Sequence, residues 1–379
     1  MLVASLYVYA FLSEFILIYP VYTLLFTDTG ISVAQASSLF AIWSLTGLLL
    51  EVPSGAWADT VSRRLLLFLG PLLTGLGFAL WLLFPSYWVF ALGFVLWGAG
   101  EALISGSYEA LAYEELERRG RAHRYATVMG RATSLGLVAN AAAIGLAVPV
   151  FAAGGYPVVG MASVLACVVG AAVALTLPEH RTPGSAGERR YLAILREGIT
   201  QARADRGVLR AVLLVSFVTA IWGALEEYVP YLGAETGVAK TTIPLLILLV
   251  WVGATAGGLL AGPAERMPAR AYALTLGLAA AALAAGAASG HAAGFVPIAV
   301  AFGAFQLAGV LADVRLQERI TGPARATVTS VAGLGTNVVT LTVYTAYGAA
   351  SPYASHGVTF TLLTLPYVLI ALLAAQSSR

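Results

Sequence analysis

The chain has 379 residues, of which 59% are hydrophobic and only 11% are charged, and its formal net charge is +2. Soluble domains carry roughly 25% charged residues, so this chain has too few polar side chains to cover a surface in water. The composition excludes an ordinary soluble protein and predicts one whose solvent is lipid. The small net charge gives no electrostatic reason to expect a nucleic-acid partner.

The apolar residues form stretches long enough to cross a bilayer as helices, which takes ~20 residues each. The first stretch has no basic segment or cleavage site and is too long for the core of a signal peptide, so we expect a retained span. Twelve spans are predicted, at residues 2–26, 35–56, 65–85, 87–112, 125–152, 156–177, 208–232, 242–262, 270–290, 293–315, 325–350 and 357–376. The fold class is therefore all-α integral membrane, with twelve transmembrane helices.

The basic residues lie on one side of these spans. All 20 arginines fall in the connections after even-numbered spans, in the C-terminal tail or at the adjoining ends of spans, and only Lys240 falls on the other side. Because lysine and arginine mark the cytoplasmic side of a membrane protein, both termini are predicted to be cytoplasmic. We expect a multi-pass protein of the cell inner membrane.

The longest connection, residues 178–207, divides the chain into two halves of six spans. It holds ten of the 40 charged residues, and its apolar residues recur at helical spacing. This pattern predicts an amphipathic helix on the inner leaflet, with a solvated linker helix as the alternative. The expected domains are an N-terminal six-helix bundle at 1–177, this linker, and a C-terminal six-helix bundle at 208–379.

The two halves also resemble each other when the chain is shifted by 200 residues. Nine of the 28 positions in 111–138 are identical to their counterparts in 311–338, including Arg119 and Arg319 in the polar connections. A duplicated six-helix unit with both copies in one orientation is typical of transporters. Gly258 and Gly262 are small residues four positions apart, a spacing that predicts close approach of a neighbouring helix.

A charged loop joins spans 2 and 3 in the segment GAWADTVSRR. Gly55, Asp59 and Arg63 recur every four residues, and Arg64 follows directly. The carboxylate can accept hydrogen bonds at a helix start, and arginines offer paired donors to carboxylates. We expect this cluster to hold the inner ends of helices together and to release them.

This segment resembles the loop 2–3 signature of the major facilitator superfamily, which places Gly, Asp, Arg and a second basic residue at these positions. The loop between spans 8 and 9 keeps a weaker version in Gly262, Glu265, Arg266 and Arg270. The resemblance implies two pseudo-symmetric six-helix bundles that expose a midplane site alternately to each side. It also implies that spans 1, 4, 7 and 10 line the cavity. Within the superfamily, the chain is most similar to twelve-span proton-coupled drug exporters.

Acidic residues occur inside the predicted spans, where each costs at least ~2.5–3.5 kcal/mol and therefore indicates function. Glu14 and Glu101 lie near mid-membrane in spans 1 and 4, and Glu226 and Glu227 lie in the outer third of span 7. A carboxyl group in a low-dielectric cavity can bind and release a proton near neutral pH. We expect Glu14 and Glu101 to carry the coupled proton, with Glu226 next; the alternative is a buried carboxyl hydrogen-bonded to Tyr or Ser.

A second layer of charges lies nearer the cytoplasm. The depths of Glu109 in span 4 and Arg131 in span 5 predict a buried ion pair, and Glu51 is the expected third member. Asp313 and Arg315, at the inner end of span 10, are the repeat-related residues. We interpret this layer, together with the loop 2–3 cluster, as a cytoplasmic gate or latch.

Aromatic residues near the cavity spans include Tyr19, Trp97 and Trp222, which offer stacking surfaces for an amphipathic or cationic substrate. The alternative is ordinary packing or an interfacial aromatic belt. The four histidines all fall in predicted loops, and no spacing of His, Cys and acidic residues indicates a metal site. The single cysteine, Cys167, excludes an intramolecular disulfide, and without a phosphate-binding loop we expect no cofactor.

The sequence predicts a secondary active transporter and not an enzyme. The favoured function is proton-coupled efflux, by antiport, of a small amphipathic or cationic organic compound. A proton-coupled importer of a small organic nutrient and a flippase for a lipid-like substrate stay open as alternatives. The expected partners are the substrate, protons and membrane lipid, with the protein acting as a monomer and without nucleic acid.

Overall fold

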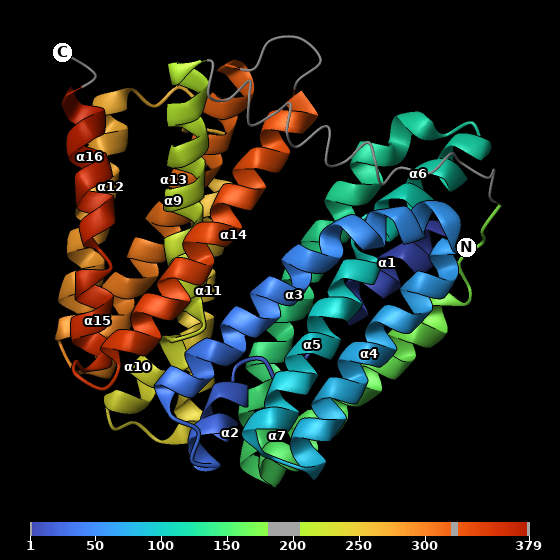
Figure 1. Ribbon diagram of the computed structural model, residues 1–379, viewed down its shortest axis with the longest axis horizontal. Coiled ribbons are helices and arrows are strands. Elements are labelled where there is room, and N and C mark those ends of the chain that lie inside the picture. The colour runs from blue at the N-terminus through green and yellow to red at the C-terminus, as the bar shows by residue number, and fades with distance from the viewer. Residues whose placement is uncertain (1, 181–204, 320–324, 377–379) are drawn as a thin grey trace. The chain divides into compact units, whose positions relative to one another are not determined.

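The computed structural model describes residues 2–180, 205–319 and 325–376, and of these it describes only the backbone at 51–52, 55–56, 58–60, 325–327 and 376. The chain divides into two compact units, Met1–Tyr191 and Leu192–Arg379. Every regular element in the described residues is a helix (Figure 1). Most of the predicted linker, including its amphipathic helix, lies outside the described residues.

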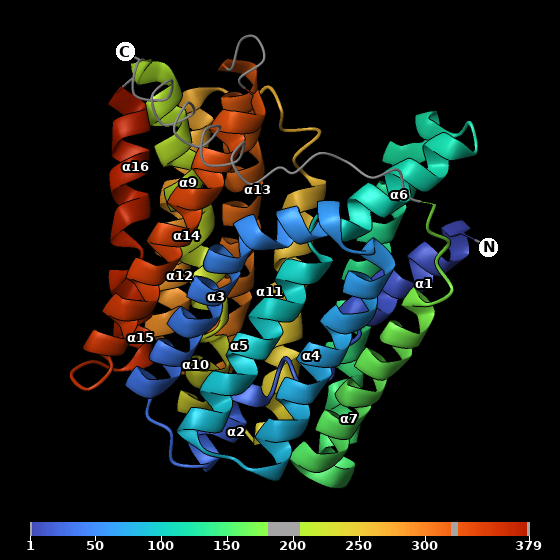
Figure 2. The ribbon, with the colours of Figure 1, turned by 45° about the vertical axis from the view of Figure 1, so that its right-hand side comes forward.

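Unit 1 contains seven α-helices among its described residues: α1 (Leu2–Glu14), α2 (Tyr22–Asp28), α3 (Val33–Thr60), α4 (Arg63–Leu83), α5 (Tyr87–Ile104), α6 (Ser107–Arg118) and α7 (Tyr125–Ala174). Helix α7 is two helices in one, because Gly155 has the non-helical angles φ 60° and ψ −155°. This glycine separates predicted spans 5 and 6. Helix α4 packs between α5 and α7, and α1 lies along α7 (Figure 2).

Unit 2 contains eight α-helices among its described residues: α9 (Arg206–Glu226), α10 (Val229–Glu235), α11 (Ile243–Leu259), α12 (Ala269–Ala288), α13 (Phe295–Arg319), α14 (Arg325–Ala350), α15 (His356–Leu362) and α16 (Leu365–Gln376). Helix α13 packs against α11, α12 and α9, while α14 lies along α9. Across the described residues of both units, nine helical segments are long and apolar enough to cross a membrane, judged by length and composition, and some of them join two neighbouring helices, as α5 with α6 and α15 with α16.

Polar side chains fix where several helices begin. Ser32 starts α3 with a reciprocal capping box to Gln35, and Ser62 and Ser355 accept the amides of Leu65 and Val358 at the starts of α4 and α15. The first amides of a helix have no partner within the helix, so these side chains satisfy donors that would otherwise lack a partner in the protein.

Four predicted spans are interrupted, which the apolar pattern did not reveal. Span 1 breaks between α1 and α2, span 4 between α5 and α6, span 7 between α9 and α10, and span 12 between α15 and α16. The span 4 break has a local cause, since Gly106 adopts a φ of 72° that side chains with a Cβ rarely take. The breaks in spans 1 and 7 directly follow Glu14 and Glu226, so both acidic residues lie at helix ends.

The connection between spans 2 and 3 is shorter than the predicted span ends, 56 and 65, indicated, while Gly55 and Asp59 lie at the end of span 2 as their four-residue spacing predicted. Helix α3 continues to Thr60, so Gly55 and Asp59 belong to its last two turns, and only Val61 and Ser62 separate it from α4. The apolar pattern ends earlier than the helix, because polar residues at the end of a helix can stay in water while the backbone remains helical.

Close helix packing in unit 2 involves a different glycine pair from the predicted one. A Cβ built on Gly253 would lie 2.1 Å from the carbonyl oxygen of Ala299, and one on Gly257 would lie 1.8 Å from that of Gly303. Gly258 has ordinary space, 3.6 Å from Gln306. The backbones of α11 and α13 therefore meet along Gly253 and Gly257. The helix face that carries this pair is displaced by one residue from the face of Gly258, which the sequence predicted.

Candidate functional site

Glu101 in unit 1 lies beside a group of aromatic rings. The indole Nε1 of Trp43, on α3, donates a hydrogen bond of 3.1 Å to Glu101 Oε2 on α5. The Trp43 ring lies 4.8 Å from that of Trp97, and Tyr19, in the break between α1 and α2, stacks on Trp97 at 5.1 Å with 8° between the planes. The predicted residues Glu101, Trp97 and Tyr19 are thus brought together.

The rings behind this group are buried core. Tyr22 is 3% exposed and packs edge-on against Trp97, while Trp81 and Phe94 are fully buried. Glu101 is exposed, and Trp43 and Tyr19 are partly exposed. A rigid aromatic wall therefore carries a carboxylate at its accessible edge, and such a surface can bind a cation through both the ring faces and the negative charge.

Glu14 is the last residue of α1 and its side chain is exposed. A Cβ built on Gly136 of α7 would lie 3.1 Å from Glu14 Cγ, so the side chain crosses α7 at a position that only glycine leaves open. Asn140, one turn further along α7, is 6% exposed, and its Oδ1 has no hydrogen-bond partner among the described residues. A buried acceptor of this kind is costly unless something binds it.

In unit 2, Glu226 and Trp222 lie one turn apart on α9. Trp251 of α11 donates a hydrogen bond to the Glu226 carboxylate. The buried Trp222 Nε1 has no acceptor among the described residues, while its ring packs edge-on against Phe302 at 5.8 Å. Glu227 follows in the turn before α10 and interacts electrostatically with Tyr344. Together these residues offer two carboxyl groups and one hydrogen-bond donor, Trp222 Nε1, that has no acceptor among the described residues.

Sequence reasoning missed the two tryptophans that hold these carboxyl groups. Trp43 lies in predicted span 2 and Trp251 in span 8, which correspond in the two halves, and each lies about ten residues into its span. Tryptophan is enriched at membrane interfaces, so its presence near the middle of both spans was an available signal.

The predicted cytoplasmic layer is only partly seen. Glu51, Gly55 and Asp59 lie in α3, and their side chains are outside the described atoms. Arg63 begins α4 and forms an ion pair of 2.6 Å with Glu114, while its backbone amide donates to Glu179 Oε1 at 2.6 Å. Ser62 also donates its hydroxyl proton to Glu179.

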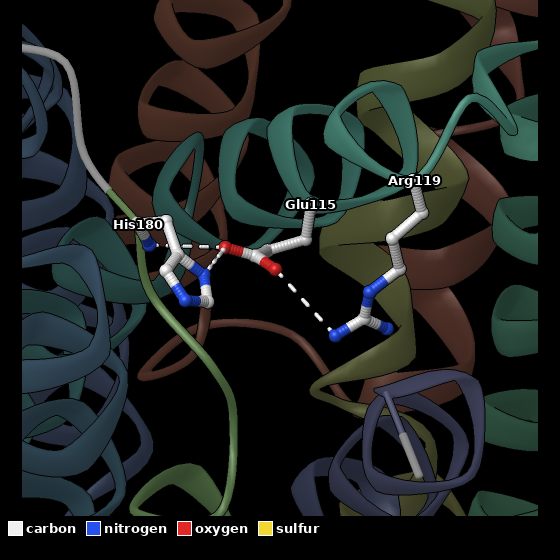
Figure 3. Close-up of polar contacts among 3 residues, drawn as sticks. All are labelled: Glu115, Arg119 and His180. Atoms are coloured by element: carbon white, nitrogen blue, oxygen red, sulfur yellow. Dashed lines mark hydrogen bonds and ion pairs between the residues drawn. The ribbon is translucent and has the colours of Figure 1, made fainter.

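A second cluster, also missed from sequence, joins the same helices. Glu115 of α6 is 2% exposed, and its Oε1 lies 3.0 Å from the backbone amide of His180 and 2.9 Å from His180 Nδ1 (Figure 3). Arg119 lies 3.6 Å from the other carboxylate oxygen. The two clusters tie the start of α4, helix α6 and the residues after α7 to one another.

The predicted ion pair between Glu109 and Arg131 is not formed in the structure. Both side chains are exposed, and neither contacts an oppositely charged group among the described residues. The reason is the break at Gly106, because Glu109 lies on the separate helix α6 and does not continue the register of α5. Arg64 is also exposed.

The repeat-related residues in unit 2 make other contacts. Arg315 donates a hydrogen bond of 2.9 Å to the Met267 carbonyl and lies 4.3 Å above the Tyr272 ring. Asp313 is exposed and lies 3.5 Å from the Gln317 amide. Among these contacts no ion pair between Asp313 and Arg315 is seen.

The histidine prediction also needs correction. His356 is not a loop residue, since it begins α15, and its Nδ1 lies 2.8 Å from the Tyr347 hydroxyl. Its ring stacks on Tyr231 at 5.5 Å. The predicted apolar span starts one residue after His356, so the sequence pattern placed this histidine in the preceding loop. Its stacking partner comes from another helix, and the sequence gives no sign of such a contact.

The apolar helices of the described residues define a multi-pass membrane protein, and the family and solved structures that it resembles indicate a transporter rather than an enzyme. The Major Facilitator Superfamily family model matches residues 3–231. The chain belongs to that superfamily. No curated protein sequence matches the chain.

Solved transporters have the same fold. PepTSo, a transporter of the POT family, superposes with a TM-score of 0.74 at 13% identity, covering 100% of this chain and 97% of its own. The nucleoside transporter NupG gives 0.71 at 12% identity, covering 100% and 98%. A bacterial homologue of the lysosomal transporter Spinster gives 0.70 at 16% identity, covering 99% and 95%.

Proposed function

We propose that the protein exports a small amphipathic or cationic organic compound in exchange for protons. The observation that carries this proposal is the Glu101 carboxylate at the edge of the Trp43, Trp97 and Tyr19 rings. Aromatic faces attract organic cations, at about 0.5–2 kcal/mol for each favourable contact, and an adjacent carboxylate adds a full negative charge.

Three features support a substrate of mixed character. The aromatic wall in unit 1 suits an apolar ring system, and the buried Asn140 Oδ1 can accept a hydrogen bond. In unit 2, the unpaired Trp222 Nε1 can donate one. In either unit, an apolar compound with a few polar groups would find a hydrogen-bonding partner, which fits the usual chemistry of small-molecule sites.

The same carboxyl groups suit proton exchange. A proton on Glu101 removes the charge that a cationic substrate would meet, so substrate and proton would compete for this site, as antiport requires. Glu14 is a second candidate, at the end of a half-helix next to the span 1 break, where transporters of several folds place coupling sites. Glu226 is the repeat-related candidate in unit 2.

In this proposal the protein is a monomer in the cell inner membrane with cytoplasmic termini. The cytoplasmic latch includes the loop 2–3 residues, Glu51 and Glu109, Arg131, Asp313 and Arg315. Efflux by a mechanism like that of drug exporters is favoured over import, since the aromatic wall offers few hydrogen-bonding groups for a nutrient.

The test is transport by the purified protein in proteoliposomes with pH gradients of either sign. A panel of lipophilic cations, neutral isosteres and polar nutrients serves as substrates. We expect organic cations to move across the membrane in the direction opposite to the flow of protons. We expect Glu101→Gln and Glu14→Gln to abolish this coupled movement. Glu117→Gln, an exposed change on α6, should leave it intact.

Two results would contradict the proposal. Coupled movement in both Glu101→Gln and Glu14→Gln would remove the proton assignment. Movement of polar nutrients together with protons, without cation exchange, would replace efflux with import.

A further inference from the structure

A separate pocket lies in unit 2, at the end of the bundle opposite the start of α9. It is formed by the ends of α10 and α12, the start of α13 and the length of α15, and its volume is about 340 Å³. Leu232, Phe295 and Leu362 provide apolar walls. The size is near the lower end of the ~300–1,000 Å³ typical of ligand sites, so the pocket fits a small group.

The pocket has one strong charge. Glu235 is the only carboxylate among its described lining residues, and these include no Lys or Arg. Its side chain is exposed, and its Oε1 and Oε2 accept the backbone amides of His356 and Gly357 at 3.2 and 3.1 Å. These bonds fix the carboxylate but supply no cation, so a negative charge faces a largely apolar hollow.

Two imidazoles lie near this carboxylate, and both have other hydrogen-bond partners. His356 is not a lining residue, and its Nδ1 already lies 2.8 Å from the Tyr347 hydroxyl. His291 is exposed at the rim, and its Nδ1 donates to the Ser289 carbonyl. The His356 ring also interacts electrostatically with Glu235, but Glu235 is the carboxylate among the described lining residues that a positively charged ligand in the pocket would meet.

We propose that this pocket binds an ammonium group carried on an apolar body, with the cation against Glu235 and the apolar part against Leu232, Phe295 and Leu362. The site is distinct from the Glu101 and Glu226 groups described above and does not depend on the proposed transport reaction. Fixed carboxylate oxygens at a mostly apolar wall bind such a ligand with little loss of freedom in the protein.

This chemistry has two sources: a free organic cation, and the headgroup of a phosphatidylethanolamine lipid. Val358 and Leu362, on the α15 side of the pocket, are 50% and 53% exposed. Apolar exposure of this kind suits a site open to the lipid phase, so both sources can reach Glu235.

The labelling rate of a cysteine placed in the pocket measures whether a ligand occupies the pocket. In Val358→Cys protein, maleimide labels the new thiol, whereas the native Cys167 is buried at 4% exposure. Benzyltrimethylammonium at about ten times its dissociation constant should slow this labelling about tenfold, the factor 1 + [L]/Kd. Neopentylbenzene, which has the same shape without the charge, should not protect.

Three further variants in the Val358→Cys background locate the effect. Glu235→Gln should abolish protection, and Ala288→Phe, which adds a ring at a lining position of the pocket, should abolish it as well. Asp28→Asn, which removes an exposed carboxylate in unit 1, should keep it, as should Glu101→Gln. Protection in Glu101→Gln separates this pocket from the transport site.

The lipid arm uses the same reporter in nanodiscs. If maleimide labelling is slower in phosphatidylethanolamine discs than in phosphatidylcholine discs, and this difference is lost in Ala288→Phe, the lipid headgroup is the ligand. If the labelling rates in the two lipids are equal while benzyltrimethylammonium still protects, the ligand is a free cation. The proposal is overturned if neopentylbenzene protects equally, or if protection survives in both Glu235→Gln and Ala288→Phe proteins that keep the parent melting temperature.

Discussion

At the scale of single residues, Glu115 shows how a buried charge can hold two segments together. Its carboxylate accepts both the backbone amide and the ring Nδ1 of His180, so Glu115→Ala removes two hydrogen bonds at once. Leaving buried groups without a partner costs ~1–3 kcal/mol. We expect the variant to lower the apparent melting temperature in detergent by roughly 2–4 °C for each kcal/mol lost.

Glu117→Ala is the matched control, since Glu117 lies on the same helix with an exposed side chain. Its melting temperature should stay at that of the parent protein. Equal melting of Glu115→Ala and Glu117→Ala would mean that water replaces the His180 contacts without loss, and that Glu115 contributes nothing to the stability of unit 1.

At the scale of elements, the close contact between α11 and α13 depends on glycine residues, which have no side chain. Gly257 leaves no room for a Cβ, which would lie 1.8 Å from the Gly303 carbonyl oxygen. Gly257→Ala must therefore separate the two helices, and overpacking of this kind costs ~1–3 kcal/mol. Gly258→Ala, on the same helix and at 3.6 Å from Gln306, should be tolerated.

Apparent melting temperatures of the two alanine variants, measured side by side in detergent, check this expectation. Only Gly257→Ala should melt earlier than the parent. If Gly258→Ala were the destabilised variant, the helical register of α11 would be the one that the small-residue spacing at Gly258 and Gly262 predicted.

At the scale of the whole molecule, each of the two units, Met1–Tyr191 and Leu192–Arg379, has its own internal packing. In unit 1 the core includes Leu6, Tyr9 and Leu67, and in unit 2 it includes Val212 and Leu316. Because each core is made within one unit, the covalent link between them is not needed for either to pack.

We therefore expect a chain cut between Tyr191 and Leu192 to function when both pieces are produced together. The two pieces should insert, co-purify and move the same substrates in proteoliposomes as the intact protein. Each piece alone should not transport. Degradation of both pieces, even when they are co-produced, would show that the two units need the covalent link in order to pack.

The sequence predicted much of the fold because transmembrane helices follow from composition. A bilayer requires about 20 apolar residues for each crossing, so the spans, the duplication and the superfamily signature could all be recognised in one dimension. The acidic positions Glu14, Glu101 and Glu226 were visible for the same reason, since charge is rare in such segments.

What the tertiary structure alone decided is which side chains meet. The hydrogen bonds from Trp43 to Glu101 and from Trp251 to Glu226 join different helices, as do Glu115 and His180, and apolar periodicity carries no information about such pairs. The helix breaks after Glu14 and at Gly106 were hidden too, because an apolar segment looks the same whether its helix is continuous or interrupted. The sequence by itself determined the kind of segments, apolar helices, through the cost of placing polar groups in lipid. The number of crossings, twelve, stays a prediction beside the nine candidate spans found among the described residues. The structure decided the site, because a binding group is assembled by packing between helices.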